Sequence, residues 1–404
     1  MQGVGLYPAP VKVALYHPWI YLRGGAERTI LELTRRSRNS WAVFTHHLSP
    51  RTTFSEFSEV DVVELEPRIS VRRSFSELVR AAAAIATTRL PDVGARALLV
   101  SSESVGDFVL ARNRLPAVCY CHTPLKILHD QKTRDALRQS DPVKSIALGI
   151  MAPVFEGVER RLWKRYAHIF VNSDEVRSRV VKARRTSRAS LEVLHPGVDL
   201  LRFALHDEAR EDFFLVPGRI VYWKNIELAI DAFVAARAAG LRSTLVVAGI
   251  VDEKSTPYLA ALRHRAAGHP VSFETDVSDD RMATLMKRSL AVLFPSWNED
   301  FGIIPLEAMA AGAPVLAIDR GGPRETIQND VTGWLIEADP ERFARRMLDI
   351  EAAPKSLEPM RRAASERAAS FSWDHFAQRV DAVMEQVATG EPPPVTRTDN
   401  LTAP

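Results

Sequence analysis

Two carboxylates eight positions apart frame the segment of this chain that is best suited to chemistry. Glu299 lies in an expected loop and Glu307 in an expected short helix. The backbone amides of Phe301, Gly302 and Ile303 fall at or just before the start of that helix, where unpaired N–H groups and the helix dipole favour an anion such as a diphosphate. Because carboxylates repel phosphate, we expect Glu299 and Glu307 to accept hydrogen bonds from neutral hydroxyls, one on a sugar and one on a ribose.

Two basic residues follow another expected strand. Gly218 and Arg219 come directly after the apolar run 213–216, and Lys224 stands at the start of the next expected helix. Open α/β sheets bind ligands at the carboxyl ends of their strands. Arg219 and Lys224 are therefore expected to clamp a diphosphate and to stabilise the charge that develops when a nucleotide leaves. With the helix start at Gly302, they predict a site for a nucleotide sugar.

The first half of the chain offers further candidates. Gly24 and Gly25 follow the first expected strand and open a helix, so the backbone can approach a phosphate closely there. His122 ends the expected strand 117–121, just before the strand-breaking Pro124. We expect His122 to hydrogen-bond a sugar hydroxyl or the leaving phosphate, and not to act as a nucleophile. No Gly-x-Gly-x-x-Gly string follows any strand, which argues against an NAD-dependent dehydrogenase.

The string from Glu299 to Val315, Glu-Asp-Phe-Gly-Ile-Ile-Pro-Leu-Glu-Ala-Met-Ala-Ala-Gly-Ala-Pro-Val, resembles the Glu-x7-Glu signature of the family 4 retaining glycosyltransferases. The resemblance implies the GT-B fold, two facing Rossmann-like domains with the donor in the cleft. It also implies that Val277 lines the nucleobase pocket through its backbone. The chain departs from the family at Thr275, near which a glycine is usual, and this departure puts the local backbone shape in doubt.

The expected elements alternate between strand and helix twice along the chain, which predicts two doubly wound α/β domains with parallel sheets. We expect an N-terminal Rossmann-like acceptor domain over residues 1–203 and a C-terminal nucleotide-sugar domain over 204–370. By resemblance to the family, the helix 371–389 crosses back onto the first domain. Residues 390–404 contain three consecutive prolines and are expected to be a disordered tail.

Composition limits the classes of function. The 404 residues carry a net charge of only +3, which argues against nucleic acid as a partner. Cys119 and Cys121 are expected to stay unpaired, and there is neither a secretory signal nor an apolar run long enough to span a bilayer, so we expect a cytoplasmic protein. Basic residues crowd 159–166 and 177–188, with Trp163 and Tyr166 between them. Such segments are either solvated faces or helices that lie on an anionic membrane leaflet.

These observations predict a retaining glycosyltransferase that moves a hexose from a nucleoside-diphosphate sugar to a glycan or lipid-linked glycan acceptor. The Gly-Gly-Ala-Glu-Arg string from Gly24 and the Tyr-Cys-His-Thr-Pro string from Tyr120 resemble mannosyltransferases of bacterial surface-polysaccharide assembly, which favours GDP-mannose as donor. UDP-glucose and UDP-N-acetylglucosamine remain open. No Asp-x-Asp follows an apolar strand, so neither a metal nor a cofactor is expected. A nucleotide-sugar 2-epimerase and an inactive sugar-nucleotide-binding partner protein are the alternatives.

Overall fold

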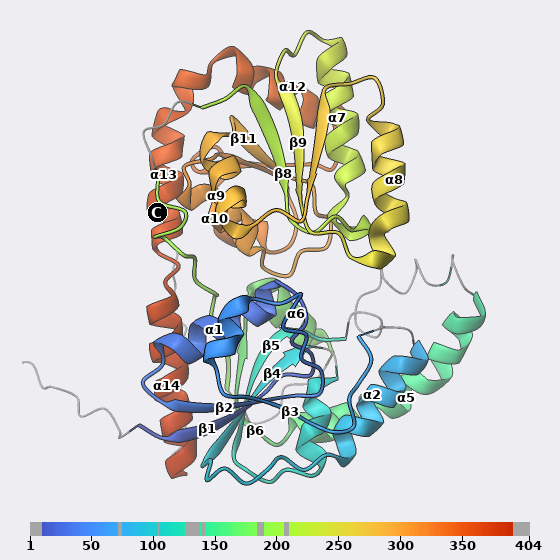
Figure 1. The fold of residues 1–404 in the computed structure, drawn as a ribbon, viewed down its shortest axis with the longest axis vertical. Helices are drawn as coiled ribbons and strands as arrows, with labels where there is room; N and C mark the ends of the chain where they lie inside the picture. Colours follow the sequence, from blue (N-terminus) through green and yellow to red (C-terminus); the bar gives the residue numbers. More distant parts are fainter. Residues whose placement is uncertain are drawn as a thin grey trace, which may run out of the picture. The chain divides into compact units, whose positions relative to one another are not determined.

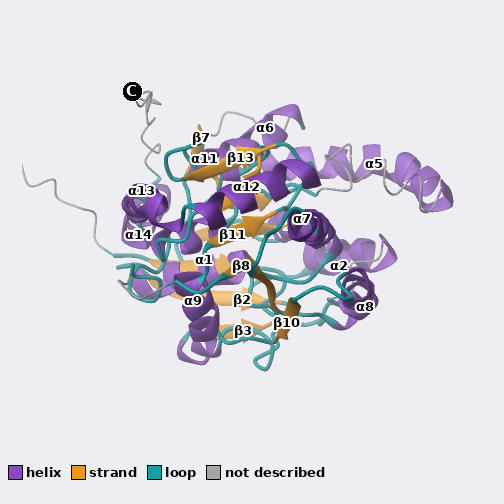
Figure 2. Cartoon of the chain, turned by 90° about the horizontal axis from the view of Figure 1, so that it is seen from above, coloured by secondary structure: helices purple, strands orange, loops and turns teal. Residues whose placement is uncertain are grey.

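Figure 1 shows the computed structural model of the chain, which describes residues 10–71, 75–103, 105–125, 138, 142–183, 190–205 and 210–390. The chain folds into two compact units. The first unit consists of Met1–Pro196 together with Trp373–Pro404, and the second of Gly197–Ser372. Each unit is built around one parallel sheet with helices packed on it (Figures 1 and 2).

The first unit has a seven-stranded sheet in the order β3-β2-β1-β4-β5-β6-β7. Its strands are β1 (Lys12–Tyr16), β2 (Ser40–Thr45), β3 (Val62–Glu64), β4 (Ala97–Glu103), β5 (Ala117–Thr123), β6 (Tyr166–Val171) and β7 (Ser190–Val193). Its helices are α1 (Gly25–Arg36), α2 (Phe75–Thr87), α5 (Pro142–Trp163), α6 (Asp174–Lys182) and α14 (Trp373–Thr389), with short 3-10 turns η1 (Ser55–Glu59) and η2 (Gly106–Ala111).

The second unit has a six-stranded sheet in the order β10-β9-β8-β11-β12-β13. Its strands are β8 (Phe213–Pro217), β9 (Thr244–Gly249), β10 (Val271–Thr275), β11 (Ala291–Phe294), β12 (Val315–Ile318) and β13 (Gly333–Ile336). Its helices are α7 (Ile226–Ala238), α8 (Thr256–Arg265), α9 (Asp279–Arg288), α10 (Ile303–Ala310), α11 (Pro323–Thr326), α12 (Pro340–Ala352) and α13 (Glu358–Ala369), with 3-10 turns η3 (Tyr222–Lys224), η4 (Glu253–Ser255) and η5 (Pro354–Leu357).

Alternation along the strands of the second unit builds two cores from one sheet. Phe214 and Val216 of β8 pack in a cluster that also holds residues of α7 and α12, whereas Phe213 and Leu215 pack in a cluster with α9, α10 and α13. Successive side chains of a strand point to opposite faces. Because helices cover both faces, every residue of β8 is apolar and buried. The parallel, doubly wound prediction is confirmed.

Helix α14 is fastened to the first unit by buried carboxylates. Asp381, 2% exposed, accepts hydrogen bonds from the Arg38 N–H at 3.0 Å and from Asn39 Nδ2 at 2.9 Å. Glu385 is fully buried and accepts from Arg38 Nε at 2.7 Å. Tyr120 of β5 meets Phe376 edge-on, with ring centroids 5.1 Å apart. The polar and aromatic contacts together explain why this C-terminal helix belongs to the first unit, beside α1 in Figure 1.

The boundary between the two units lies earlier in the chain than expected. Residues 197–203 belong to the second unit and not to the first, because the Val198 N–H bonds the Phe371 carbonyl at 3.1 Å and Phe203 packs in the second unit's core. Helix α13 was not expected, since its Ala- and Arg-rich sequence lacks a clear apolar period. The predicted tail from residue 391 onward lies outside the described residues.

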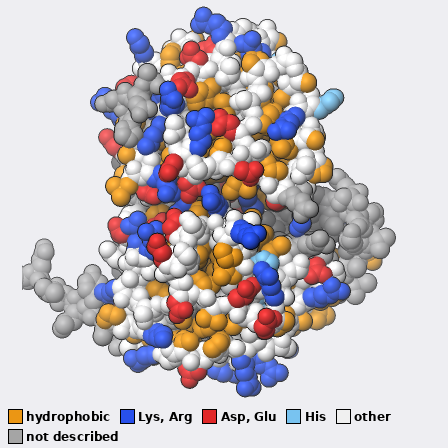
Figure 3. All heavy atoms as spheres, viewed as in Figure 1, with side chains coloured by type: hydrophobic (Ala, Val, Ile, Leu, Met, Phe, Trp, Pro, Cys, Tyr) orange, Lys and Arg blue, Asp and Glu red, His pale blue; other side chains and the backbone are white. Residues whose placement is uncertain are grey.

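The basic segment 159–166 does not carry its aromatic side chains on the surface. Trp163 is fully buried and Tyr166 is 3% exposed, and both pack in the core of the first unit. The second basic segment is described only as far as residue 183. Cys119 and Cys121 are free thiols, as expected. On the face shown in Figure 3, Lys and Arg side chains are interspersed with Asp and Glu, so that face has no large patch of one sign.

Candidate active site

Strand order selects one place in each sheet for a ligand. In the second unit the chain runs from β8 outward through β9 and β10, then returns to β11 on the other side of β8. In the first unit the same reversal separates β1 from β4. Ligands of open α/β sheets bind beyond the carboxyl ends of the strands at such reversals. The predicted residues Gly218, Arg219 and Glu299 follow β8 and β11, and Gly24 follows β1.

The start of α10 is open to an anion. Gly302 precedes the helix with φ +87, a left-handed conformation that glycine adopts without strain. No side chain caps the helix and its first turn holds no acidic residue. The helix begins at Ile303, where the sequence predicted its start, with Pro305 inside the first turn, where the missing N–H breaks no hydrogen bond. Unpaired first-turn N–H groups and the helix dipole suit a phosphate here.

The loop after β8 lies against this helix start. Gly218 has φ +114, and a Cβ placed on it would lie 2.6 Å from Cδ1 of Ile304 in the first turn of α10. The loop therefore requires glycine for its conformation and for its close approach to the helix. Arg219 follows immediately, with its guanidinium carbon 5.7 Å from the centroid of the Trp223 ring. The geometry thus brings the predicted glycine–arginine loop beside the predicted phosphate-binding turn.

Lys224 and Glu299 form an ion pair, which the sequence did not reveal. Lys224 Nζ lies 2.5 Å from Oε2 of Glu299, and Ser296 Oγ lies 3.2 Å from the same oxygen. The two side chains are only 14% and 20% exposed. Lys224 was expected to hold phosphate and Glu299 to hold the sugar, at separate places. In the structure Lys224 and Glu299 bond each other, just after the end of β11.

Gly322, in the loop after β12, packs against the segment that contains Glu299. The N–H of Gly322 donates to the Glu299 carbonyl at 3.2 Å, and a Cβ on Gly322 would lie 2.1 Å from the Phe301 carbonyl oxygen. Phe301 itself is 2% exposed and packs in the core. Glu307, one turn into α10, is half-buried. The predicted phosphate-binding turn is therefore held between the Gly322 loop and the core.

The residue before Val277, which is expected to line a nucleobase pocket, has an unusual backbone. Asp276 has φ +57, and its N–H donates to the Gly249 carbonyl at 2.8 Å. Asp is one of the few residues other than glycine that tolerate this left-handed conformation. Asp276 therefore supplies the turn for which a glycine near Thr275 is usual. Val277 is half-buried and packs against the core behind α9 and α10.

His122 of the first unit is buried within a small polar cluster. Its Nε2 lies 2.9 Å from Ser101 Oγ on β4, and Nδ1 of His17, directly after β1, lies 3.0 Å from the Ser101 carbonyl oxygen and 3.1 Å from Oγ. Burial, and then the neighbouring His17, lower the pKa of His122 to about 3, against a small opposing effect of Glu103. His122 is therefore neutral at physiological pH. His17 and Ser101 were missed, although each stands at the end of an expected strand.

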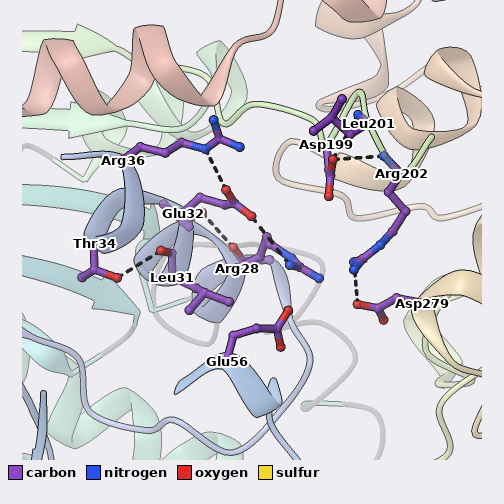
Figure 4. A network of polar contacts seen from close by, with 12 residues as sticks. Arg28, Leu31, Glu32, Thr34, Arg36, Glu56, Asp199, Leu201, Arg202 and Asp279 are labelled. Carbon is purple, nitrogen blue, oxygen red and sulfur yellow. Dashed lines mark hydrogen bonds and ion pairs between the residues drawn. The ribbon is translucent and has the colours of Figure 1, made fainter. Parts of the chain in front are cut away.

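Gly24 and Gly25 open α1 as expected. Gly24 is extended, at φ −109, and a Cβ there would meet Glu27 Oε2 at 2.6 Å. Glu27 is 5% exposed and accepts from the Leu22 N–H at 3.2 Å, so its carboxylate closes this loop. Figure 4 shows the next turns of α1, where Glu32 lies between Arg28 and Arg36. The helix start is thus braced by an acid that sequence reasoning did not single out.

The described residues contain neither a metal cluster nor a membrane-spanning helix. Among the residues that the structure describes, no group of three or more His, Cys, Asp or Glu side chains could hold a metal ion. Within the same ranges, no helix is both long enough and apolar enough to cross a membrane.

Two family models match the chain in succession. Residues 23–202 match the model described as Glycosyltransferase Family 4, and residues 199–369 match the model of glycosyl transferases group 1. The chain belongs to glycosyltransferase family 4. The junction of the two models at residues 199–202 lies close to the division between the two units.

Two of three similar proteins cover most of this glycosyltransferase, and the third covers about half of it. The mouse alpha-1,3/1,6-mannosyltransferase ALG2 is 27% identical over 91% of this chain and 94% of its own length, and the human protein is 29% identical over 83% and 86%. The D-inositol 3-phosphate glycosyltransferase of Mycobacterium avium is 33% identical, over 51% of this chain and 52% of its own length.

Solved structures show that this glycosyltransferase has the GT-B fold. Sucrose-phosphate synthase from Thermosynechococcus elongatus superposes with a TM-score of 0.72 at 18% identity, covering 94% of this chain and all of that one. Anabaena HepE in complex with UDP gives a TM-score of 0.70 at 17% identity, covering 92% and 98%. Likeness at such low identity shows the architecture alone, because one fold can carry different chemistries.

Proposed function

We propose that this glycosyltransferase transfers mannose, with retention of configuration and without a metal ion, from GDP-mannose to a hydroxyl of a lipid-linked glycan. The observation that carries the donor site is the uncapped start of α10 at Gly302, beside the loop that bears Arg219 and Lys224. Similarity to named mannosyltransferases over nine-tenths of the chain supports mannose. Gly24, Gly25 and His122 are proposed to complete the donor contacts, and Val277 to line the base.

The proposed reaction exchanges two bonds at one carbon. The bond from the anomeric carbon to the diphosphate oxygen breaks, the acceptor oxygen bonds to that carbon on the same face, and the acceptor proton passes to an oxygen of the departing diphosphate. Negative charge on the diphosphate grows as the bond breaks, so Arg219, Lys224 and the α10 terminus stabilise the transition state more than the ground state. Glu299 faces the developing positive charge of the sugar ring, and Glu307 holds the ribose hydroxyls.

The experiment that tests this proposal compares donors on one purified protein. GDP-mannose, UDP-glucose and UDP-N-acetylglucosamine are each incubated with a lipid-linked glycan extract, and nucleotide release is followed with and without EDTA. We expect release from GDP-mannose that EDTA does not change, and an α-linkage in the product by NMR. Release from a UDP-sugar alone would replace the proposed donor, an outcome that the UDP-bound Anabaena structure makes worth testing. Loss of activity in EDTA would refute metal independence.

A control without acceptor separates transfer from the epimerase alternative. An epimerase converts the donor sugar at C2 without a second substrate, so donor alone would give a new nucleotide sugar. We expect intact donor in that control. If no donor is consumed under any condition but GDP or UDP still binds, the chain is a binding partner and the proposal of transfer fails.

A lipid-linked acceptor implies contact with a membrane surface, which we propose for α5. Met151, Val154 and Val158 recur at helical spacing on one face and are exposed, Val154 to 71%. Arg160 and Arg161 are exposed on the same helix. Apolar side chains beside cations suit an anionic leaflet. Val154→Glu should reduce sedimentation with phosphatidylglycerol vesicles, whereas Val331→Glu, at a residue 52% exposed in the second unit, should not. Equal sedimentation of both variants would refute this surface.

A further inference from the structure

The hydroxyl of Ser101 lies between two imidazoles of the first unit, that of His17 directly after β1 and that of His122 on β5. Nδ1 of His17 lies 3.0 Å from the backbone carbonyl oxygen of Ser101. A carbonyl oxygen only accepts, so Nδ1 of His17 must carry a hydrogen. The same N–H lies 3.1 Å from Ser101 Oγ, where it can be shared with the hydroxyl oxygen. His17 therefore approaches the hydroxyl as a donor.

This arrangement determines where the Ser101 hydroxyl hydrogen goes. Because His17 presents an N–H to Oγ, the hydroxyl cannot donate to that nitrogen. The other side-chain neighbour of Oγ among the described residues is Nε2 of His122, at 2.9 Å. An Nε2–H could donate to Oγ only if the hydroxyl hydrogen turned elsewhere, where no hydrogen bond to another side chain of the described residues awaits it. With the hydroxyl hydrogen directed at Nε2, that nitrogen accepts and carries no proton. A neutral imidazole with an accepting Nε2 carries its hydrogen on Nδ1.

Neighbouring groups keep the imidazole of His122 neutral and fixed in position. The ring of His122 is 8% exposed and meets Tyr120 edge-on, with centroids 5.0 Å apart, and His17 with centroids 6.1 Å apart. Asn172 Nδ2 donates to the His122 carbonyl at 3.0 Å and fixes the backbone. Glu103 opposes the lowering of the His122 pKa, and its influence is smaller than those of burial and His17. No group of the described residues bonds Nδ1 of His122, so that donor is left for a ligand.

We propose that Ser101 is a positioning residue that locks His122 as an Nδ1–H donor directed at an acceptor oxygen of the nucleotide-sugar substrate. The identity of the substrate in this proposal rests on the proposed function, whereas the tautomer of His122 does not. It makes His122 a hydrogen-bond donor of fixed direction, and it excludes a role as proton-accepting base through Nε2. His17 supports the arrangement by turning the Ser101 hydroxyl toward His122.

The first test measures the tautomer directly in the intact protein without substrate. The protein is labelled with ¹⁵N-histidine, and His122→Asn identifies the His122 signals in the spectrum. We expect a protonated Nδ1 and an unprotonated Nε2 in the unsubstituted protein at pH 7, and a mixture of tautomers after Ser101→Ala. A protonated Nε2 in the unsubstituted protein would overturn the proposal, whatever the activity of the chain.

The second test uses the shapes of Asn and Gln. The amide nitrogen of Asn can occupy the position of histidine Nδ1, and that of Gln the position of Nε2. His122→Asn should therefore retain more kcat/KM than His122→Gln. Ser101→Ala should lower kcat/KM about tenfold, the scale of one hydrogen bond, and Ser101→Thr should restore most of it. In the His122→Asn background, which has no tautomer to set, Ser101→Ala should change kcat/KM less than about twofold.

Ser102 supplies the matched control. It lies next to Ser101 on β4, is equally buried, and donates to the buried carboxylate of Asp107 at 2.9 Å. Ser102→Ala should destabilise the first unit without changing the His122 signals or kcat/KM. Equal losses from Ser101→Ala with and without His122→Asn would show that Ser101 acts through folding alone, and would refute the proposal. Absence of any transfer by the unsubstituted protein would refute the proposed function, while the tautomer measurement would still decide this one.

Discussion

Glu299→Gln tests the role of the Lys224–Glu299 ion pair in the proposed donor site. Lys224 Nζ is 2.5 Å from Glu299 Oε2. A bound diphosphate must therefore take Lys224 from this carboxylate, or share it. Gln keeps the size of the side chain and an acceptor for Ser296, but removes the charge. The substitution should lower turnover, since a carboxylate near the sugar stabilises an oxocarbenium-like transition state.

The same substitution should have the opposite effect on the affinity for free GDP. Coulomb's law at an effective dielectric constant of about 20 gives roughly 5 kcal/mol for unit charges about 3 Å apart, an upper limit. Measured net values for ion pairs that water can reach are about 1 kcal/mol. With side chains 14% and 20% exposed, we take about 1 kcal/mol for the competition with diphosphate. GDP should bind Glu299→Gln about fivefold more tightly, while turnover falls about 10²-fold.

The assay pairs nucleotide release with calorimetric titration of GDP on the same preparation. Glu307→Gln is the matched control, because it removes a carboxylate of the same site that is proposed to hold ribose. That control should bind GDP more weakly. If Glu299→Gln also weakens GDP binding, Glu299 contacts the nucleotide and our assignment to the sugar is wrong. Near-normal turnover with unchanged GDP affinity would show that the ion pair is a structural contact only.

Three other predictions concern the donor site, the C-terminal helix and pH. Arg219→Ala should lower kcat more than it raises KM, because the negative charge that Arg219 stabilises grows as the diphosphate leaves. If steady-state kinetics show an effect on KM alone, Arg219 contributes only to ground-state binding. Arg38→Ala should lower the stability of the first unit by about 3 kcal/mol in denaturant unfolding, since it removes a partner of the fully buried Glu385, and a loss below about 1 kcal/mol would contradict this. Burial lowers the pKa of His46 to about 4, below its unfolded value near 6.5. The stability contributed by neutral His46 is therefore complete above pH 6.5 and is lost as pH falls toward 4. Between about pH 7 and pH 5, the free energy of unfolding should fall by about 2 kcal/mol more in the unsubstituted protein than in His46→Gln. Equal losses in the two proteins would refute this prediction.

The sequence was sufficient for the parts of the fold that depend on local pattern. Buried parallel strands are continuous apolar runs, and each alternates with a helical segment, so β8 could be predicted almost to the residue from the run 213–216. Helix α13 was missed because its apolar side is built of alanines such as Ala364 and Ala368, which give little periodic signal although both are fully buried. The boundary between the units was predicted too late in the chain, because the hydrogen bond between residues 198 and 371 cannot be recognised from local sequence.

The candidate site shows the same division between local and non-local information. Glu299, Gly302 and Lys224 could be proposed because strand ends and helix starts are visible in the sequence. Their pairing could not be predicted, since Lys224 and Glu299 belong to loops of different strands and meet only through the β8–β11 adjacency. Ser101 was invisible for the same reason, because a serine in a buried strand has no distinctive spacing until His17 and His122 are brought to it.

The charge balance of the second unit gives the ion pair a functional meaning. A diphosphate carries about two negative charges, and the site offers Arg219, Lys224 and roughly half a charge from the start of α10. Glu299 neutralises the charge of Lys224 while the two are paired, so the net positive charge available to a diphosphate is smaller than Arg219 and Lys224 alone would give. When Lys224 moves to the phosphate of an intact donor, Glu299 can accept a hydrogen bond from a sugar hydroxyl instead. A free nucleotide has no such sugar, so the Glu299 carboxylate loses Lys224 without gaining a new partner. The pair should therefore favour the intact donor over its nucleotide product, and removing the charge at Glu299 should reduce that preference.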